Sequence, residues 1–194
     1  MFFDRSYENY YSAEVWDDKF KGGFGLDDPM EDSRYGALMM IMKRYENKGP
    51  VLDFGCGDGL LQEKFRAVSR VRLVGIDYAP AGIDKAKTRG LADCEFICAD
   101  YRRFQPGERY SLLVFNEAIY YINDYMNVLE RMTDYLLPDG HIVVSMFQTR
   151  VTARIWKQLM ARLQMVQGAW TGDERSGRRW TIRVFERPAV FSGK

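Results

Sequence analysis

Three glycines at alternate positions, Gly55, Gly57 and Gly59, constrain the fold of this chain more than any other feature. They lie between an apolar run that ends at Phe54 and a stretch from Leu60 onward with the apolar spacing of a helix. Glycine adopts backbone conformations that other residues avoid, so the pattern predicts a tight strand-to-helix turn. Such a turn also lets a ligand approach the main chain at the start of the helix. An ordinary strand-to-helix loop is the alternative, because glycine-rich turns alone are not specific.

The spacing differs from the dinucleotide-binding fingerprint Gly-x-Gly-x-x-Gly, in which the third glycine would occupy position 60. That position is Leu60, and an acid, Asp53, lies two residues before the first glycine. A carboxylate at this place repels a pyrophosphate and suits a ligand with a cationic end. The turn therefore disfavours an NAD-dependent oxidoreductase.

The chain has 194 residues, 46% of them hydrophobic and 28% charged, which is ordinary for one globular domain. We expect a single domain, 1–194, made of an N-terminal arm and helices (1–45), a ligand-binding core (50–147) and a C-terminal helix with a closing hairpin (150–194). The three cysteines, Cys56, Cys94 and Cys98, lack the spacing of a metal site. They predict reduced thiols in a cytoplasmic protein.

Charge and hydropathy exclude several classes of partner. The net charge of +1 does not favour binding to nucleic acid through its phosphates. No apolar run approaches the roughly 20 residues of a membrane span, and we expect neither a signal peptide nor a membrane partner. Charge is nevertheless uneven, with nine acids and four bases in 1–34, against three acids and nine bases in 150–187. The acidic N-terminal segment and the basic C-terminal segment either form solvated faces or meet over a substrate.

Apolar runs alternate with helical patterns along the core. The predicted strands are 51–54, 72–77, 95–100, 111–116 and 141–147, with helices at 36–45, 60–68, 79–87 and 122–137, the last stopped by 138–140. Near-continuous apolar strands separated by helices predict a parallel sheet that is covered on both faces. The end breaks this order: a helix (152–164) precedes two strands, 165–171 and 180–186, joined by a turn-rich segment. A closing antiparallel hairpin is the expected result.

Acidic residues follow the second and third predicted strands. Asp77 ends one strand, where an acid could accept the hydroxyls of a ribose, and Asp100 with Tyr101 ends the next, where they could hold an adenine ring. Ligands of open α/β sheets bind beyond the carboxyl ends of the strands. The alternative for each acid alone is that it caps the helix that follows.

Taken together, these residues resemble the first three motifs of the class I S-adenosylmethionine-dependent methyltransferases, and the hairpin resembles the antiparallel end of that sheet. The resemblance implies an α/β, Rossmann-like fold with a mostly parallel seven-stranded sheet, and S-adenosylmethionine as cofactor with S-adenosylhomocysteine as product. It places the methionine part on the glycine turn, with Asp53 near its amino group, Asp77 at the ribose and Asp100 at the adenine. The remaining cofactor-binding residues implied are Gly55, Cys56, Gly57, Gly59, Tyr78, Tyr101 and Asn116.

The segment after the fourth strand faces the reacting sulfonium in this fold. Many relatives have Glu-His at the positions of Tyr120 and Tyr121, whereas the only histidine of this chain is His141. Glu117-x-x-Tyr-Tyr resembles small bacterial methyltransferases of the nodulation-type chitooligosaccharide N-methyltransferase group. Our hypothesis is that Glu117, Tyr120 and Tyr121 are catalytic and orient the acceptor, with Glu117 as the base. In the alternative, Glu117 bonds local backbone and the tyrosines pack.

The N-terminal arm is the expected substrate lid. Its candidate substrate-binding residues are Tyr11, Trp16, Arg34 and Tyr35, although its aromatic residues could instead pack as an amphipathic helix on the sheet. No metal site is expected. The predicted activity is methyl transfer to an amine or hydroxyl of a small molecule, with a sugar-containing metabolite preferred, by a monomer or homodimer. The alternatives are a methyltransferase-fold partner or regulatory subunit without its own catalysis, and a protein-directed methyltransferase.

Overall fold

The structure, a computed structural model, describes residues 12–24, 27–47, 49–174 and 177–188. Its helices are α1 (Ala13–Lys21), α2 (Asp32–Tyr45), α3 (Leu60–Arg66), α4 (Pro80–Thr88), α5 (Tyr125–Thr133) and α6 (Arg150–Arg162), with 3-10 turns η1 (Pro29–Glu31) and η2 (Ile119–Tyr121). Its strands are β1 (Val51–Phe54), β2 (Leu73–Asp77), β3 (Cys94–Cys98), β4 (Tyr110–Asn116), β5 (Leu136–Phe147), β6 (Met165–Asp173) and β7 (Arg178–Glu186).

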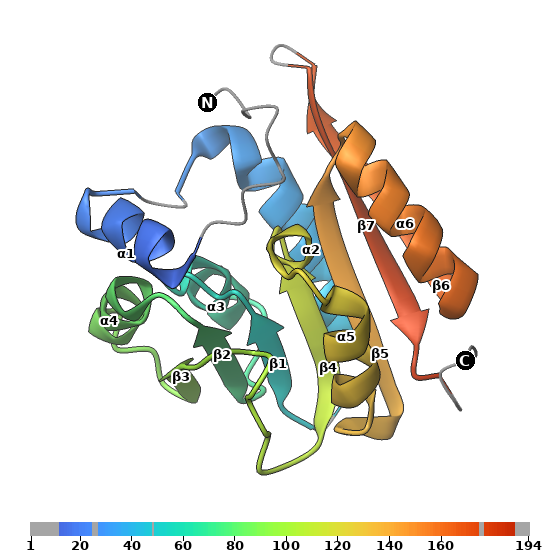
Figure 1. Ribbon diagram of the computed structural model, residues 1–194, viewed down its shortest axis with the longest axis horizontal. Coiled ribbons are helices and arrows are strands. Elements are labelled where there is room, and N and C mark those ends of the chain that lie inside the picture. Colours follow the sequence, from blue (N-terminus) through green and yellow to red (C-terminus); the bar gives the residue numbers. More distant parts are fainter. Residues whose placement is uncertain (1–11, 25–26, 48, 175–176, 189–194) are drawn as a thin grey trace.

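The strands form one sheet in the order β3-β2-β1-β4-β5-β7-β6 (Figure 1). The first five in this order are parallel, and β7 lies antiparallel between β5 and β6. The chain builds outward from β1 to β3 and then restarts with β4 on the other side of β1. The carboxyl ends of β1 and β4 therefore flank the crevice where ligands bind in open α/β sheets. The predicted fold, including its closing hairpin, is confirmed.

Helices cover both faces of the sheet, which explains why its central strands are apolar throughout (Figure 1). On one face, α2 and α3 pack on Val51, Leu112 and the side chains aligned with them. On the other face, α5 and α6 pack on Leu52, Leu113 and their neighbours. Successive residues of a strand point to opposite faces, so each strand feeds both cores.

Two local predictions are wrong. The helix predicted to reach residue 137 ends at Thr133, and β5 begins at Leu136, so Pro138 lies within a strand. The pairing of β5 with β4 shifts register between Leu136 and His141, and Pro138 lies in this irregular stretch. A proline is tolerated there because no regular ladder bond needs its missing N–H. The second error concerns the last strand, whose predicted start is residue 180, whereas β7 begins at Arg178.

No helix formed by the described residues has the length and hydropathy required to cross a bilayer. No three His, Cys, Asp or Glu side chains in the same ranges gather closely enough to hold a metal ion.

The centre of the sheet offers a direct test of the packing. Phe54 of β1 and Phe115 of β4 are register partners with stacked rings, centroids 4.6 Å apart, and both are fully buried. Phe115→Ala should lower the free energy of unfolding by about 3–5 kcal/mol, because it removes a buried ring and leaves a cavity. Urea denaturation measures this. The control Met40→Ala, at an exposed site, should change it by less than about 0.5 kcal/mol, and equal effects would contradict the packing.

Candidate cofactor and acceptor site

The glycine turn between β1 and α3 requires all three of its glycines. Gly55, Gly57 and Gly59 have φ of +74°, +55° and +80°, a region that other residues rarely adopt. Space is also short: a Cβ on Gly55 would lie 2.7 Å from that of Ala118, and one on Gly59 would lie 3.0 Å from the ring of Phe96. The predicted tight turn is confirmed; within it Gly55 is partly exposed, whereas Gly57 and Gly59 are buried.

Asp53 lies beneath the turn and is buried. Gln62 donates from Nε2 to its Oδ2 at 2.8 Å, whereas Oδ1 is buried with no hydrogen-bond partner among the described residues. Burial raises the pKa of Asp53 to about 7, against the opposing effect of the Gln62 hydrogen bond. A buried acceptor of this kind fits a ligand or water that donates a hydrogen bond. Sequence reasoning missed Gln62 as the partner of Asp53. The only signal in the sequence that could have identified it is its position on the inner face of α3.

Asp77 joins the end of β2 to the glycine turn. One carboxylate oxygen accepts the N–H of Gly57 at 3.0 Å, and the other accepts the N–H of Ala79 at 2.9 Å, just before α4. Desolvation raises the pKa of Asp77, and the bonds from Ala79 and Gly57 counteract it. Asp77 therefore joins the glycine turn to Ala79, the residue before α4, without capping that helix.

The residues expected at an adenine follow β3. This strand ends at Cys98, so Asp100 lies in the turn after it rather than at its last position. Arg102 donates to the Asp100 carboxylate at 2.7 to 3.1 Å, and these hydrogen bonds hold its pKa below the ordinary value. Tyr101 is buried and meets Tyr78 edge to face, with ring centroids 5.4 Å apart. The two tyrosines thus form an aromatic wall above the carboxyl ends of β2 and β3.

Glu117 has φ of +56°, which is unusual for a residue with a side chain. This backbone turns its carboxylate toward the end of β5, where it accepts the hydroxyl of Tyr120 at 2.9 Å and the N–H of Phe147 at 3.0 Å. Burial raises the pKa of Glu117 to about 7, and Arg34 is the strongest opposing influence. The bond from Phe147 agrees with the alternative in which Glu117 binds local backbone. The raised pKa also gives this carboxyl the proton affinity of a base near neutral pH.

Arg34 connects α2 to the same region. Its buried guanidinium donates to Asn116 at the end of β4 and to Glu31, and lies 4.2 Å from the ring of Tyr35. Burial disfavours its charge, yet the neighbouring Glu117, Tyr35 and Glu31 hold the pKa of Arg34 above its ordinary value. Tyr35 itself is buried in the core beneath α2, and burial raises its pKa to about 12.

Helix α1 lies on α4 (Figure 1). Asp17 accepts the N–H of Ala81 at 2.6 Å, and Lys85 donates to the carbonyl of Phe20 at 2.5 Å. From this anchored helix, the ring of Trp16 meets that of Tyr121 edge to face at 5.1 Å. Trp16 thus joins α1 to η2. The predicted lid residue Tyr11 lies outside the described residues.

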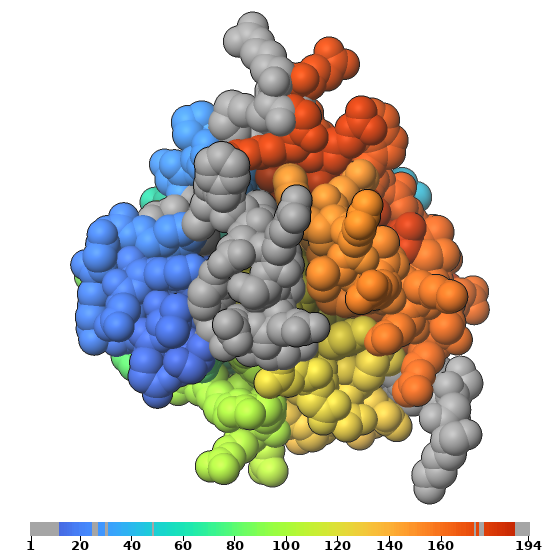
Figure 2. Space-filling model, turned by 45° about the horizontal axis from the view of Figure 1, so that its top comes forward, coloured from blue at the N-terminus to red at the C-terminus, as the bar shows by residue number. Residues whose placement is uncertain are grey.

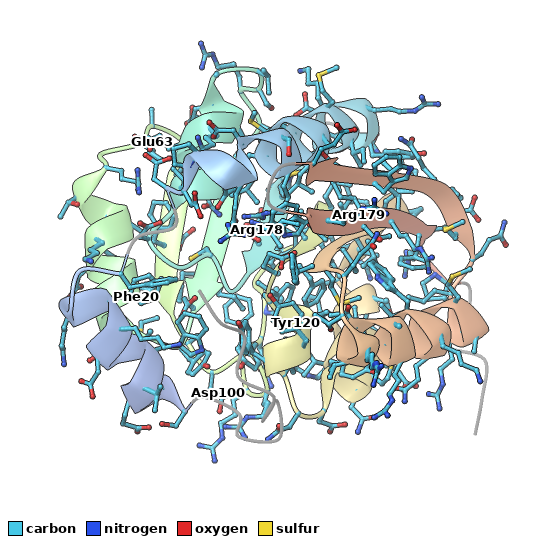
Figure 3. The ribbon with its side chains drawn as sticks, turned by 90° about the horizontal axis from the view of Figure 1, so that it is seen from above. Phe20, Glu63, Asp100, Tyr120, Arg178 and Arg179 are labelled. Carbon is cyan, nitrogen blue, oxygen red and sulfur yellow. The ribbon has the colours of Figure 1, made fainter. Side chains whose placement is uncertain are left out.

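Seen from above the carboxyl ends of the strands, Asp100 and Tyr120 lie on the near side of the site, with Phe20 of α1 at its margin (Figure 3). Arg178 and Arg179 of β7 lie on the other side of Tyr120 from Asp100 in this view (Figure 3). Glu63 of α3 follows the glycine turn, and its N–H donates to the carbonyl of Gly59 at 3.0 Å. Apart from Tyr11, the remaining candidates from the sequence lie in the glycine turn, at the strand ends, in η2 and on helices α1 and α2. Arg178 binds Asp28 at 2.9 Å and so ties β7 to the segment before α2.

The pKa of Asp53 predicts a pH-dependent stability. In the unfolded chain Asp53 has an ordinary pKa, and in the fold its pKa is raised to about 7. The folded state therefore holds this proton more tightly, and stability is lost as pH rises from about 4 through about 7. Asp53→Asn should remove part of that loss, so the ligand-free variant should gain about 1–4 kcal/mol over the natural protein at pH 8 and almost nothing at pH 4.

Urea denaturation at both pH values measures this difference. The control Asp84→Asn alters an exposed carboxylate of α4 and should change the free energy of unfolding equally at the two pH values. A gain for Asp53→Asn that is the same at pH 4 and pH 8 would show that burial does not control its protonation.

Comparisons with known proteins agree with this geometry. Residues 34–192 match the family model described as a methyltransferase domain. Trans-aconitate 2-methyltransferase of Escherichia coli is 33% identical over 120 residues, which cover 60% of this chain and 46% of that protein. The chain thus spans about half the length of the curated relatives it matches.

Solved structures share the fold. The N-methyltransferase NodS from Bradyrhizobium japonicum WM9, in complex with S-adenosyl-L-homocysteine, aligns with a TM-score of 0.70 and 24% identity over 84% of this chain and 90% of that chain. The plantazolicin methyltransferase BpumL, in complex with a triazolic desmethylPZN analogue and S-adenosylhomocysteine, aligns with a TM-score of 0.67 and 14% identity over 90% of this chain and 94% of that chain. The family model covers most of the chain and the motif resemblance is confirmed: the protein belongs to the methyltransferase domain family.

Proposed function

We propose that the protein is an S-adenosylmethionine-dependent methyltransferase that acts on an amine or hydroxyl of a small molecule. The observation that carries the proposal is the convergence of the glycine turn, Asp77 and Glu117 at the carboxyl ends of adjacent parallel strands. The bound cofactor would supply a methyl group on a sulfonium, which is already activated for displacement. The residues of the chain then have to bind the cofactor and the acceptor, orient them toward each other and exclude water.

The residues around the turn fit the cofactor. The orphaned Oδ1 of Asp53 would receive a hydrogen bond from the methionine amino group, directly or through water. Asp77 retains acceptor capacity, because a carboxylate oxygen takes more than one hydrogen bond, and it would bind the ribose hydroxyls. Tyr78 and Tyr101 would flank the adenine, with Asp100 near its amino group. Cys56 and Asn116 complete the set, with the main chain of 55–59 beneath the methionine part.

Glu117 would act as the base toward the acceptor. An amine must give up a proton before or during attack, and a carboxyl whose pKa is about 7 can take it at neutral pH. Tyr120 donates to this carboxylate and so fixes its orientation. Tyr121, in contact with Trp16, would pack against the acceptor. Arg34 would bind a polar group of the substrate, with Tyr35 supporting its guanidinium from the core.

The acceptor we favour is a small molecule, with a sugar-containing metabolite preferred. The aromatic pair Trp16 and Tyr121 supports this choice, because sugar rings present apolar faces that pack on such side chains. The names of the similar proteins, a trans-aconitate methyltransferase, the N-methyltransferase NodS and a plantazolicin methyltransferase, support a small organic acceptor in general. We further propose that 1–45 is the lid over a single domain, and that the enzyme works in the cytoplasm without nucleic acid or membrane.

Cofactor binding is the first test. Isothermal titration should detect both S-adenosylmethionine and S-adenosylhomocysteine, and Asp77→Ala should weaken each by about 10–100-fold, or about 1.4–2.8 kcal/mol. The control Asp84→Ala, on the exposed side of α4, should bind as the natural protein does. Absence of binding by the folded natural protein would refute the enzyme proposal and favour a non-catalytic partner role.

The role of Glu117 is tested by Glu117→Gln, which keeps an oxygen that Tyr120 and Phe147 can reach but removes the base. We expect kcat to fall by about 10²–10⁴-fold, and the rise of kcat with pH through about 7 to disappear. Formation of S-adenosylhomocysteine from a panel of amines and amino sugars measures it. The control is Glu130→Gln, at an exposed position of α5. An unchanged kcat and pH profile would remove Glu117 from the mechanism.

A further inference from the structure

Two polar side chains, Asp53 of β1 and Gln62 of α3, form a buried pair beneath the glycine turn. They are 2% and 1% exposed, and Gln62 Nε2 donates to Asp53 Oδ2 at 2.8 Å. The second oxygen of the carboxylate, Oδ1, and the amide oxygen of Gln62, Oε1, are both buried with no hydrogen-bond partner among the described residues. Buried acceptors are nearly always paired, so two of them beside one hydrogen bond indicate a place for a donor.

The sheet leaves room for this pair at Gly75 of β2. Gly75 is the register partner of Asp53, so both residues lie on the same face of the sheet, which α3 covers. A Cβ on Gly75 would lie 3.1 Å from Gln62 Nε2 and 2.8 Å from Sγ of Cys56. A larger residue at this position would therefore crowd the amide that holds Asp53. In the space-filling view the teal colours of β1 and α3 appear only at the margin, in keeping with a buried pair (Figure 2).

The amide orients the carboxylate without cancelling its charge, because an amide donates a hydrogen bond and adds no positive charge. Burial raises the pKa of Asp53, and the Gln62 hydrogen bond lowers it. Asp77 of β2 raises this pKa further, and Arg34 of α2 lowers it. The Cys56 thiol also lies beside the carboxylate, and burial holds the pKa of that thiol well above its ordinary value. Gln62 is thus the group that directly favours the ionised carboxylate by a hydrogen bond.

We propose that Gln62 is a positioning residue for the cofactor: it holds Asp53 by Oδ2, so that Oδ1 receives the ammonium group of the methionine part. An ammonium group has three N–H donors, so it also has one for Gln62 Oε1, directly or through one water molecule. This role rests on the proposed function, because the ligand is S-adenosylmethionine. A related ligand that lacks the ammonium group should bind independently of Gln62.

Isothermal titration with two ligands tests this role. S-adenosylhomocysteine carries the ammonium group, whereas 5′-methylthioadenosine keeps the adenosine and the sulfur but lacks the amino-acid part. Gln62→Met removes both polar atoms of the amide at similar length. At neutral pH it should weaken binding of S-adenosylhomocysteine by about 10–100-fold and that of 5′-methylthioadenosine by less than about twofold. The control Gln164→Met makes the same change at an exposed site between α6 and β6 and should alter neither affinity.

The ratio of the two affinities should also depend on pH. Asp53 binds the ammonium group in its ionised form, so the preference for S-adenosylhomocysteine should rise as pH increases through about 7. Without the Gln62 hydrogen bond the same rise should occur at higher pH, so Gln62→Met should regain affinity when the pH is raised. Asp77 would contact the ribose of both ligands, and its own titration therefore cancels in the ratio.

Asp53→Asn approaches the pair from its other side, because the Gln62 amide can still donate to an oxygen there. This variant should lose the preference at every pH, and adding Gln62→Met should change the ratio no further. The proposal therefore stays open to test even where Gln62→Met does not fold. Equal weakening of both ligands by Gln62→Met, or an unchanged preference in Asp53→Asn, would overturn it. A folded natural protein that binds neither ligand would instead refute the proposed function.

Discussion

The carboxylate of Asp77 holds together the parts of the molecule on which the site depends. It accepts one main-chain N–H from the glycine turn and one from the residue before α4, so it sets the positions of both relative to β2. Helix α4 in turn supports α1 through the N–H of Ala81 and the side chain of Lys85. The contact of Trp16 with Tyr121 therefore depends, through two helices, on one buried acid at a strand end.

On the proposed acceptor side of the site, a buried cation and a buried acid each offset part of the cost of burying the other. Arg34 comes from α2 and Glu117 from the turn after β4, and each moderates the cost of burying the other. Asn116 accepts from Arg34, and Phe147 at the end of β5 donates to Glu117. The region is thus built from helix, β4 and β5 together, and the unusual backbone of Glu117 is what turns its side chain toward this meeting point.

The sequence was sufficient to predict the fold and the residues around the glycine turn, because those depend on local patterns. Alternating glycines require positive φ, and acids after parallel strands meet at one edge. It could not predict the Asp53–Gln62 bond or the contact of Asp17 with α4, which join residues whose pairing no spacing indicates. The strand through Pro138 was missed because a ladder irregularity, visible only in the register with β4, tolerates the proline.

The docking of α1 has a consequence for how this protein can change over evolution. Asp17 binds a main-chain N–H of α4, and every residue except proline supplies that donor. The side chain at position 81 is therefore free to vary, and selection for the contact falls on Asp17 alone. Under the proposed function, Trp16, which meets Tyr121, can then change with the acceptor while the bond to Asp17 still holds α1 on α4. The residue that would contact the acceptor and the residue that anchors the helix can in this way evolve separately.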